Sequence, residues 1–338
     1  MQRSACAAAI LWLAASPALA VPSVVADLVP TGALVQDVMG DLGDVRVLLP
    51  GGASAHHYQM RPSDAQALQS ADLVFWMGPS LTPWLARATG NIDDEAQVRL
   101  LELPGLTLRG YAGAEDHDDH EAESHDDHGH DDQGHEENAH GDHGHDHGHD
   151  SHDEAAEDHA DHSHAGTDPH AWLDPDNAAV WLTAIAAALS REDPENAATY
   201  QANADAAAAR IAALDATLGA RLAPHAGQRF VVFHDAYGYF TDHFGLQPAV
   251  PVSLGDASTP SAARIGQVRS QIIKSGAVCA FPEYAHDPVL IDTVIEGSNV
   301  RLGEELSPEG GTLEHGIGQY DRLLTNMAQT LIACFEAE

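Results

Sequence analysis

Basic residues are scarce in this chain of 338 residues, which has 15 Lys and Arg against 52 Asp and Glu and a formal net charge of −37. None of the 15 forms a run. A surface that binds nucleic acid needs clustered Lys and Arg to neutralise phosphates, so the composition argues against nucleic acid as a partner. The same acidic balance suits a cation as the bound species.

Long apolar runs are also missing. The first 20 residues are typical of a secretory signal, with Arg3 as the positive start, Ala7 to Ala15 as the apolar core and Ala-Leu-Ala at 18–20 as the cleavage site. This core is shorter than the roughly 20 residues that span a bilayer, and no other stretch is long or apolar enough for a transmembrane anchor. We therefore expect cleavage after Ala20 and export of a soluble protein.

Cysteine is rare, with three residues in the whole chain, and Cys6 leaves with the predicted signal. It lacks the sequence context of a lipid-anchored cysteine. Cys279 and Cys334 remain, and an even pair in an oxidising compartment is expected to form a disulfide, with two buried free thiols as the alternative. Closing a loop of this length would stabilise the fold by about 4 kcal/mol on the chain-entropy model.

Histidine, by contrast, is abundant in one segment. Residues 115–164 hold 15 of the 23 histidines and 20 of the 52 acidic residues, without any Lys or Arg. Zinc, copper and nickel favour imidazole, whereas a segment needed only for solubility would use carboxylates alone. We predict a disordered metal-binding tract that holds several ions weakly, as a reservoir. Its histidines are His117, His120, His125, His128, His130, His135, His140, His143, His145, His147, His149, His152, His159, His162 and His164.

The rest of the chain alternates apolar, β-branched segments with helical patterns, twice over. This predicts an α/β fold of two similar lobes with mainly parallel sheets. The expected strands are 23–29, 45–49, 72–77 and 97–103 in the first lobe, and 229–233, 249–253, 277–281 and 300–302 in the second. We divide the mature chain into an N-terminal lobe (21–175, interrupted by the tract), a helical segment (176–224) and a C-terminal lobe (225–338).

The helical segment contains the longest helical pattern. Asp193 is a plausible N-cap, Pro194 suits the first helical position, and Pro224 marks the far end. Apolar residues recur at spacings of three and four, from Tyr200 to Leu222, which places them on one face. A continuous helix over 194–222 would be about 43 Å long and would join the two lobes. Two helices with a break near Ala209 are the alternative.

Eight histidines lie outside the tract, and three of them occupy informative positions. His56 follows the strand 45–49 through a Gly51-Gly52 turn, His234 directly follows the strand 229–233, and His170 lies between two Asp-Pro turns. Ligands of open α/β sheets bind in the crevice at the carboxyl ends of strands, so we expect these three to meet between the lobes. Of the remaining five, we interpret His225, His243, His286 and His315 as structural and leave the role of His57 open.

Three segments carry a resemblance to a known family. They are 51–64 (Gly-Gly-Ala-Ser-Ala-His-His-Tyr-Gln-Met-Arg-Pro-Ser-Asp), 168–175 (Asp-Pro-His-Ala-Trp-Leu-Asp-Pro) and 233–240 (Phe-His-Asp-Ala-Tyr-Gly-Tyr-Phe). The chain resembles the ZnuA-like periplasmic zinc receptors of ABC-type importers over essentially its whole mature length. The resemblance implies two lobes joined by a rigid helix and Zn²⁺ in the cleft, held by His56, His170 and His234. It also implies a periplasmic monomer whose partner is a membrane permease.

The chain departs from the family pattern in two places. Ala55 stands where the family usually has Pro, and a second histidine, His57, follows His56, so either could be the ligand. Many members also draw an acidic ligand from the loop before the last helix, where Ser307 stands here. Water, Glu305 or Glu309 could complete the shell.

The chemistry agrees with the resemblance. Three neutral imidazoles plus a water or carboxylate give the tetrahedral shell that zinc prefers, whereas manganese favours more carboxylate oxygens. We predict a protein that is not an enzyme and that captures zinc in the periplasm for delivery to an ABC permease. The alternatives are a secreted zinc buffer without a transporter, and a zinc hydrolase with Asp235 or Glu283 as general base. The sequence contains no His-Glu-x-x-His signature, which would favour the hydrolase.

Overall fold

Two parallel sheets of the same strand order form the centres of two lobes in this computed structural model, which describes residues 21–111, 166–253 and 258–337. The first sheet has the order β2-β1-β3-β4 and the second β6-β5-β7-β8, with every pair parallel. The predicted fold class is therefore confirmed. The predicted signal with Cys6 and the His-rich tract lie outside the described residues. The strands are β1 Val24–Ala26, β2 Val45–Val47, β3 Leu73–Trp76, β4 Gln97–Arg99, β5 Phe230–Val232, β6 Val250–Pro251, β7 Cys279–Ala280 and β8 Arg301–Leu302.

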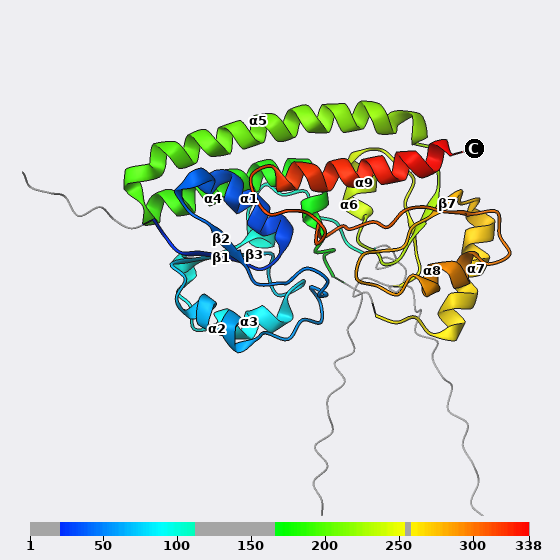
Figure 1. Cartoon of the computed structure of the whole chain (residues 1–338), viewed down its shortest axis with the longest axis horizontal. Helices are drawn as coiled ribbons and strands as arrows, with labels where there is room; N and C mark the ends of the chain where they lie inside the picture. Colours follow the sequence, from blue (N-terminus) through cyan, green and yellow to red (C-terminus); the bar gives the residue numbers. More distant parts are fainter. Residues whose placement is uncertain (1–20, 112–165, 254–257, 338) are drawn as a thin grey trace, which may run out of the picture.

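Helices cover the sheets of both lobes (Figure 1). The N-terminal lobe has α1 Val29–Met39, α2 Pro62–Gln69 and α3 Pro83–Thr89, and the C-terminal lobe has α6 Gly238–His243, α7 Ala262–Ser275 and α8 Val289–Ile295. Several predicted strand boundaries are wrong; the strand expected at 97–103 ends at Arg99 and is followed by a 3-10 turn at Leu100–Glu102. Val29, expected to end a strand, begins α1, because Pro30 in the first turn suits a helix start, where its missing N–H is not needed.

The long linking helix is continuous. A 3-10 turn at Pro194–Asn196 leads into α5 Ala197–Leu222, without the alternative break near Ala209. Asp193 accepts a hydrogen bond from the backbone N–H of Asn196, as a residue at a helix start does. The predicted apolar face is buried, from Tyr200 to Leu222, against α4 Pro175–Glu192, α1 and the last helix.

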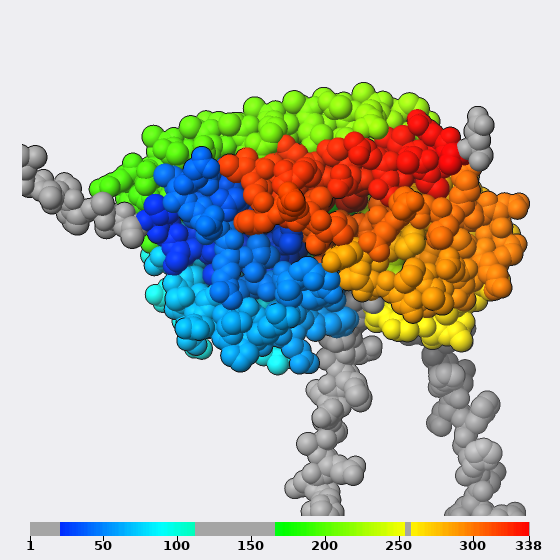
Figure 2. Space-filling model, viewed as in Figure 1, coloured from blue at the N-terminus to red at the C-terminus, as the bar shows by residue number. Residues whose placement is uncertain are grey.

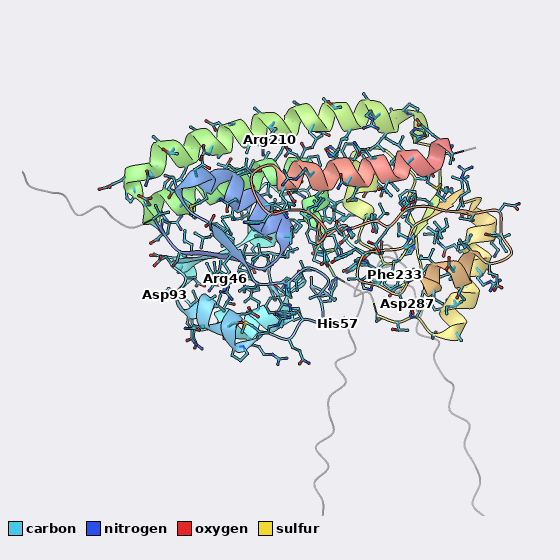
Figure 3. The ribbon with its side chains drawn as sticks, viewed as in Figure 1. Arg46, His57, Asp93, Arg210, Phe233 and Asp287 are labelled. Atoms are coloured by element: carbon cyan, nitrogen blue, oxygen red, sulfur yellow. A yellow bond between two sulfur atoms is a disulfide. The ribbon has the colours of Figure 1, made fainter. Side chains whose placement is uncertain are left out.

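The last helix, α9 Gln319–Glu336, runs beside α5 along both lobes (Figure 1). In the space-filling view the N-terminal lobe and the C-terminal lobe meet beneath these two helices (Figure 2). Arg210 of α5 donates to Asp37 of α1 at 2.6 Å and also to Asp321 of α9 (Figure 3). The two lobes therefore share one helical frame.

The expected disulfide is present between Cys279 of β7 and Cys334 of α9, with their Cα atoms 6.3 Å apart. It fastens α9 to the second sheet. Among the described residues, no helix combines the length and the apolar content needed to cross a membrane.

Candidate metal centre

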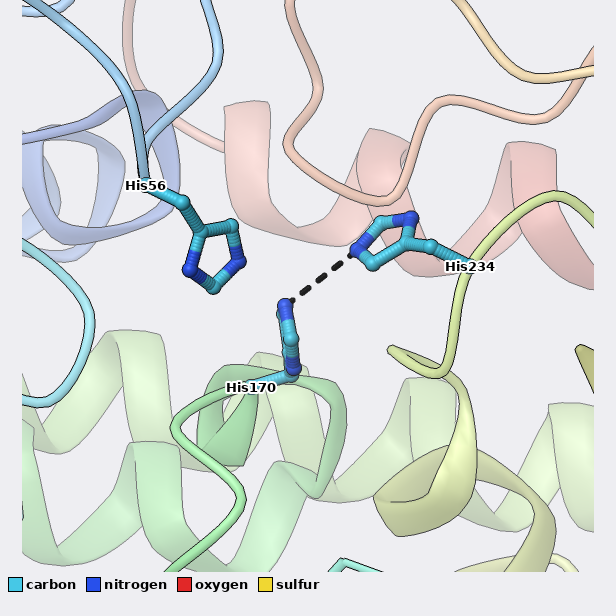
Figure 4. Close-up of side chains that lie close together, drawn as sticks. All are labelled: His56, His170 and His234. Atoms are coloured by element: carbon cyan, nitrogen blue, oxygen red, sulfur yellow. Dashed lines mark hydrogen bonds between the residues drawn. The ribbon is translucent and has the colours of Figure 1, made fainter. Parts of the chain in front are cut away.

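The three histidines singled out in the sequence converge between the lobes (Figure 4). His56, His170 and His234 each offer one ring nitrogen, and these nitrogens all lie within 4.8 Å of one another. The ring centroids are 5.5 Å apart for His56 and His170, 6.3 Å for His56 and His234, and 5.2 Å for His170 and His234. Each comes from a different loop, so the arrangement exists only when both lobes are folded and joined.

His56 is placed by the loop that follows β2. Gly52 has a φ of +82°, which favours glycine, and a Cβ on Gly51 would lie 2.9 Å from the carbonyl oxygen of Gly311, so the turn requires two glycines. Trp84 of α3 then donates from its indole to the carbonyl of Ala55 at 2.8 Å. The Nε2 atom of His56 is buried and has no hydrogen-bond partner among the described residues.

His170 is fully buried at the start of a short 3-10 turn, Ala171–Leu173. One oxygen of Asp168, Oδ1, accepts from the backbone N–H of His170 at 3.0 Å and lies 2.7 Å from its Nδ1. Trp172 packs edge-on against the ring and donates to the carbonyl of Pro308 at 2.8 Å. The ring is thus held by its own turn and by the loop before α9.

His234, at the end of β5, has an equivalent carboxylate partner in Glu283. Its Nδ1 lies 2.7 Å from Oε1 and 2.9 Å from Oε2 of Glu283, and both side chains are almost fully buried. Tyr237 donates its hydroxyl to the same Oε2 at 3.0 Å. Ligand histidines commonly have such a carboxylate on the nitrogen that does not bind the metal, because it fixes the tautomer and the ring orientation.

Because Asp168 and Glu283 accept from the Nδ1 atoms, the Nε2 atoms of His170 and His234 face each other in the centre. With Nδ1 of both rings donating, the Nε2 atoms of His170 and His234 are unprotonated in the neutral rings, and they lie 3.3 Å apart. Facing lone pairs repel unless a proton or a metal ion lies between them. Two ligand nitrogens about 2.0 to 2.1 Å from a tetrahedral zinc ion are separated by about 3.3 Å, so this pair matches one edge of that shell.

Burial affects the charge of the centre. The pKa of His56 is held well below its usual range, first by burial and then by repulsion from His170 and His234. Its ring is therefore neutral, which is the form that binds metal. Burial is the largest effect on His234 and acts to lower its pKa, but the charge and hydrogen bond of Glu283 together with the charges of Glu309 and Asp235 give a net upward shift.

The other candidate ligands lie outside this group. His57 is exposed, with its ring centroid 6.4 Å from that of His56, and it lies on the side of the junction formed by the N-terminal lobe (Figure 3).

Glu305 is exposed and borders a cavity against α9. Glu309 is partly buried; burial raises its pKa to about 7, while His234 and a hydrogen bond from the backbone of Ala55 oppose the rise. Within the described residues, no fourth His, Cys, Asp or Glu joins the three histidines at the same distance limit.

Two histidines interpreted as structural belong to polar clusters. His243 of α6 lies between two carboxylates, with Nδ1 2.9 Å from Asp174 and Nε2 2.7 Å from Asp215. These bonds raise its pKa to about 9, so the protonated ring links α6 to the start of α4 and to α5. His286 lies beside Glu283. In the sequence, His286 is marked by its position three residues after Glu283, which follows the predicted strand 277–281. This signal is weak by itself.

The fold and the convergent histidines together define a two-lobed α/β metal-binding protein. Solved structures share this fold. A Cd-bound periplasmic metal-binding protein from Candidatus Liberibacter asiaticus superposes with a TM-score of 0.67 at 18% identity, covering 92% of this chain and 98% of that one. A mutant of the laminin-binding adhesin Lmb from Streptococcus agalactiae gives a TM-score of 0.68 at 20% identity, over 93% of this chain and 100% of the other.

The particular family follows from the sequence comparisons. The family described as "ZnuA: Zinc-uptake complex component A periplasmic" matches residues 24–334, and the chain belongs to it. The high-affinity zinc uptake system protein ZnuA of Paracoccus denitrificans (strain Pd 1222) is 56% identical over 333 residues, 98% of this chain and 97% of the relative. The protein of the same name from Brucella abortus (strain 2308) is 38% identical over 315 residues, 92% and 91% of the two chains.

Proposed function

We propose that this chain captures zinc with high affinity in the periplasm and delivers it to an ABC permease for uptake. Its relatives along nearly the whole length are named as zinc uptake proteins. The observation that carries the proposal is the pair of Nε2 atoms of His170 and His234, 3.3 Å apart, with Nδ1 of each ring occupied by a carboxylate. Such a pair is arranged to share a cation.

In this proposal the zinc ligands are His56, His170 and His234, with water as the fourth. Neutral imidazoles in a tetrahedral shell suit zinc, whereas a manganese site would offer more oxygen ligands. The buried, unpartnered Nε2 of His56 favours it over His57. Glu309 is the alternative fourth ligand, because its carboxyl interacts electrostatically with His234.

The proposal also assigns roles outside the described residues. The chain is exported, with cleavage after Ala20, and works as a monomer. The tract at 115–164 gathers ions and raises their local concentration. A β-bridge pairs Gly110 with Thr167, the described residues on either side of this segment, and Asp168, the partner of His170, follows Thr167 directly.

Delivery depends on how far the lobes can move. Because α5 and α9 extend along both lobes, we infer small lobe rotations and reordering of the ligand loops rather than wide opening. The permease would then recognise the arrangement of those loops. Growth of a deletion strain under zinc starvation separates a receptor from a passive buffer, since a buffer without a transporter is not needed for uptake.

A zinc hydrolase is disfavoured at one of its two candidate bases, Glu283, by the hydrogen bonds that this carboxylate accepts. Glu283 already accepts hydrogen bonds from His234 and Tyr237, which reduces its basicity toward a zinc-bound water. Asp235 is partly buried, and burial followed by repulsion from Asp168 raises its pKa. We propose that the protein has no catalytic activity, which a screen of ester and peptide hydrolysis with zinc loaded would test.

The decisive experiment is a chelator-competition zinc titration of the mature protein, a variant without residues 115–164, and His234→Ala. We expect one tight site to survive loss of the tract and to disappear in His234→Ala. His315→Ala, a change at an exposed histidine, is the matched control and should retain the tight site. Tight binding that persists in His234→Ala, or that vanishes with the tract, contradicts the assignment.

A further inference from the structure

A second pair of metal-ligating groups lies on the outer side of the centre. Nε2 of His286 is 3.5 Å from Oε1 of Glu283, close to the separation of about 3.3 Å expected for two ligand atoms on one tetrahedral zinc ion. The ligand atoms of His234, Glu283 and His286 all lie within 4.8 Å of one another. The ring of His286 has its centroid 6.1 Å from that of His234.

The backbone holds His286 in this position at a cost. Ala285 has a φ of +68° and is the non-glycine residue with positive φ among the described residues. Such a conformation costs about 1–3 kcal/mol and is characteristic of functional sites. It lets the backbone N–H of His286 donate to the carbonyl of Glu283 at 3.1 Å. The ring then stacks on Phe233, with centroids 4.1 Å apart and planes 24° from parallel.

The pair borders an accessible cavity. Glu283 and His286 line a cavity of about 50 Å³ together with Ser54 from the other lobe and with Glu309. A volume of that size holds a water molecule or a partly hydrated ion. The side chain of His286 is 21% exposed and that of Glu283 is 4% exposed, so the histidine faces solvent and the carboxylate faces inward. His286 therefore lies nearer the surface, and Glu283 lies between it and His234.

We propose that Glu283 and His286 form a second metal position, which receives a divalent transition-metal ion before the ion passes to the three-histidine centre. The proposal rests on the proposed function, because it assigns the loading route of the same centre. Glu283 contacts both positions: its two oxygens lie 2.7 and 2.9 Å from Nδ1 of His234, and Oε1 also lies 3.5 Å from Nε2 of His286. With two protein ligands completed by water, this position binds more weakly than the centre, as an intermediate stage requires.

The position is tested by anomalous diffraction at the zinc edge from crystals of the full chain in excess zinc, for the native protein and His286→Asn. We expect an inner peak among the three histidines in both proteins, and an outer peak between Glu283 and His286 in the native protein alone. A native protein without the outer peak, or an outer peak that persists in His286→Asn, overturns the proposal. An absent inner peak overturns the proposed function instead, so the two failures are distinguishable.

The loading role is tested in solution by stopped-flow mixing of the full chain with zinc in the presence of a chromophoric chelator. We expect His286→Asn to load the tight site several-fold more slowly than the native protein. His315→Asn, at an exposed histidine, is the matched control and should load at the native rate. A native rate in His286→Asn means binding at crystal concentration only and overturns the loading role.

Discussion

The guanidinium of Arg109 donates from Nη1 to Oδ2 of Asp168 at 3.0 Å, while the other oxygen of that carboxylate orients His170. Nε of Arg109 lies 3.1 Å from a carboxylate oxygen of Asp242 in α6. A Cβ on Gly238 would lie 1.2 Å from Nη1, so only glycine leaves room for the guanidinium. One arginine therefore connects α6 of the C-terminal lobe with a proposed zinc ligand.

Arg109→Met is expected to weaken zinc binding at the tight site by about tenfold, because groups that orient a ligand through its partner typically contribute that much. Chelator competition measures the change. Arg99→Met, which removes exposed ion pairs with Asp94 and Glu102, is the control and should bind as the native protein does. An unchanged affinity in Arg109→Met would show that Asp168 holds His170 without help.

Glu283→Gln should lower zinc affinity by about ten- to a hundredfold, because the amide replaces the charged acceptor of Nδ1 and reduces the basicity of His234. The matched change is Glu305→Gln, at an exposed carboxylate considered as a fourth ligand. It should have no effect at the tight site. Loss of tight binding in Glu305→Gln, measured by the same competition, would instead place Glu305 in the zinc shell.

The stability of the fold should fall at alkaline pH because of His243. Its bonds to Asp174 and Asp215 raise its pKa to about 9, above its ordinary value of 6.5. A raised folded-state pKa gives stabilisation that is fully present below about pH 6.5 and is lost as the pH rises through about 9. We expect a loss of about 1 to 2 kcal/mol after allowance for solvent screening.

Urea unfolding at pH 6 and pH 9.5 measures this loss. His243→Gln should flatten the pH dependence, since the amide does not titrate. His315→Gln, at an exposed histidine, should keep the native slope. An equal slope in all three proteins would assign the alkaline loss to other groups.

Removing the disulfide should destabilise the protein by about 2 to 4 kcal/mol, because the bond between Cys279 and Cys334 closes a long loop in the unfolded chain. Denaturant unfolding of the double variant Cys279→Ala/Cys334→Ala measures the change. Reduction of the native protein should give a similar loss, whereas the double variant should not respond to the reductant. Neither cysteine belongs to the groups of ligand atoms found among the described residues, so tight zinc binding should be retained.

The strands and most helices were predictable because their patterns are local. β1 and β3 are apolar and buried throughout, as strands of covered parallel sheets are, and the spacing of apolar residues in α5 marks its buried face. The start of α1 was missed because Val29 suits a strand by type. Its conformation is decided by the proline that follows it.

The centre was predictable only in part. The expected meeting followed for His56 and His234 from the ends of two strands, and for His170 from its place between two Asp-Pro turns. Glu283 lies 49 residues from His234, and no sequence spacing marks it as that ring's partner. Adjacent residues in a loop also have no fixed orientation, so the sequence could not choose between His56 and His57, whereas the fold buries the Nε2 of His56 and leaves His57 exposed.

The helical frame of α5 and α9 has a thermodynamic consequence. A receptor that closes by a large hinge motion loses part of its binding free energy to the closing step. Here both lobes are fixed to the same pair of helices, and the three rings are already held by carboxylates and backbone contacts, so little of that free energy is lost on capture. In the proposed function, the same frame is expected to slow spontaneous release of the ion. The permease that receives the zinc would then have to supply the free energy that loosens the site.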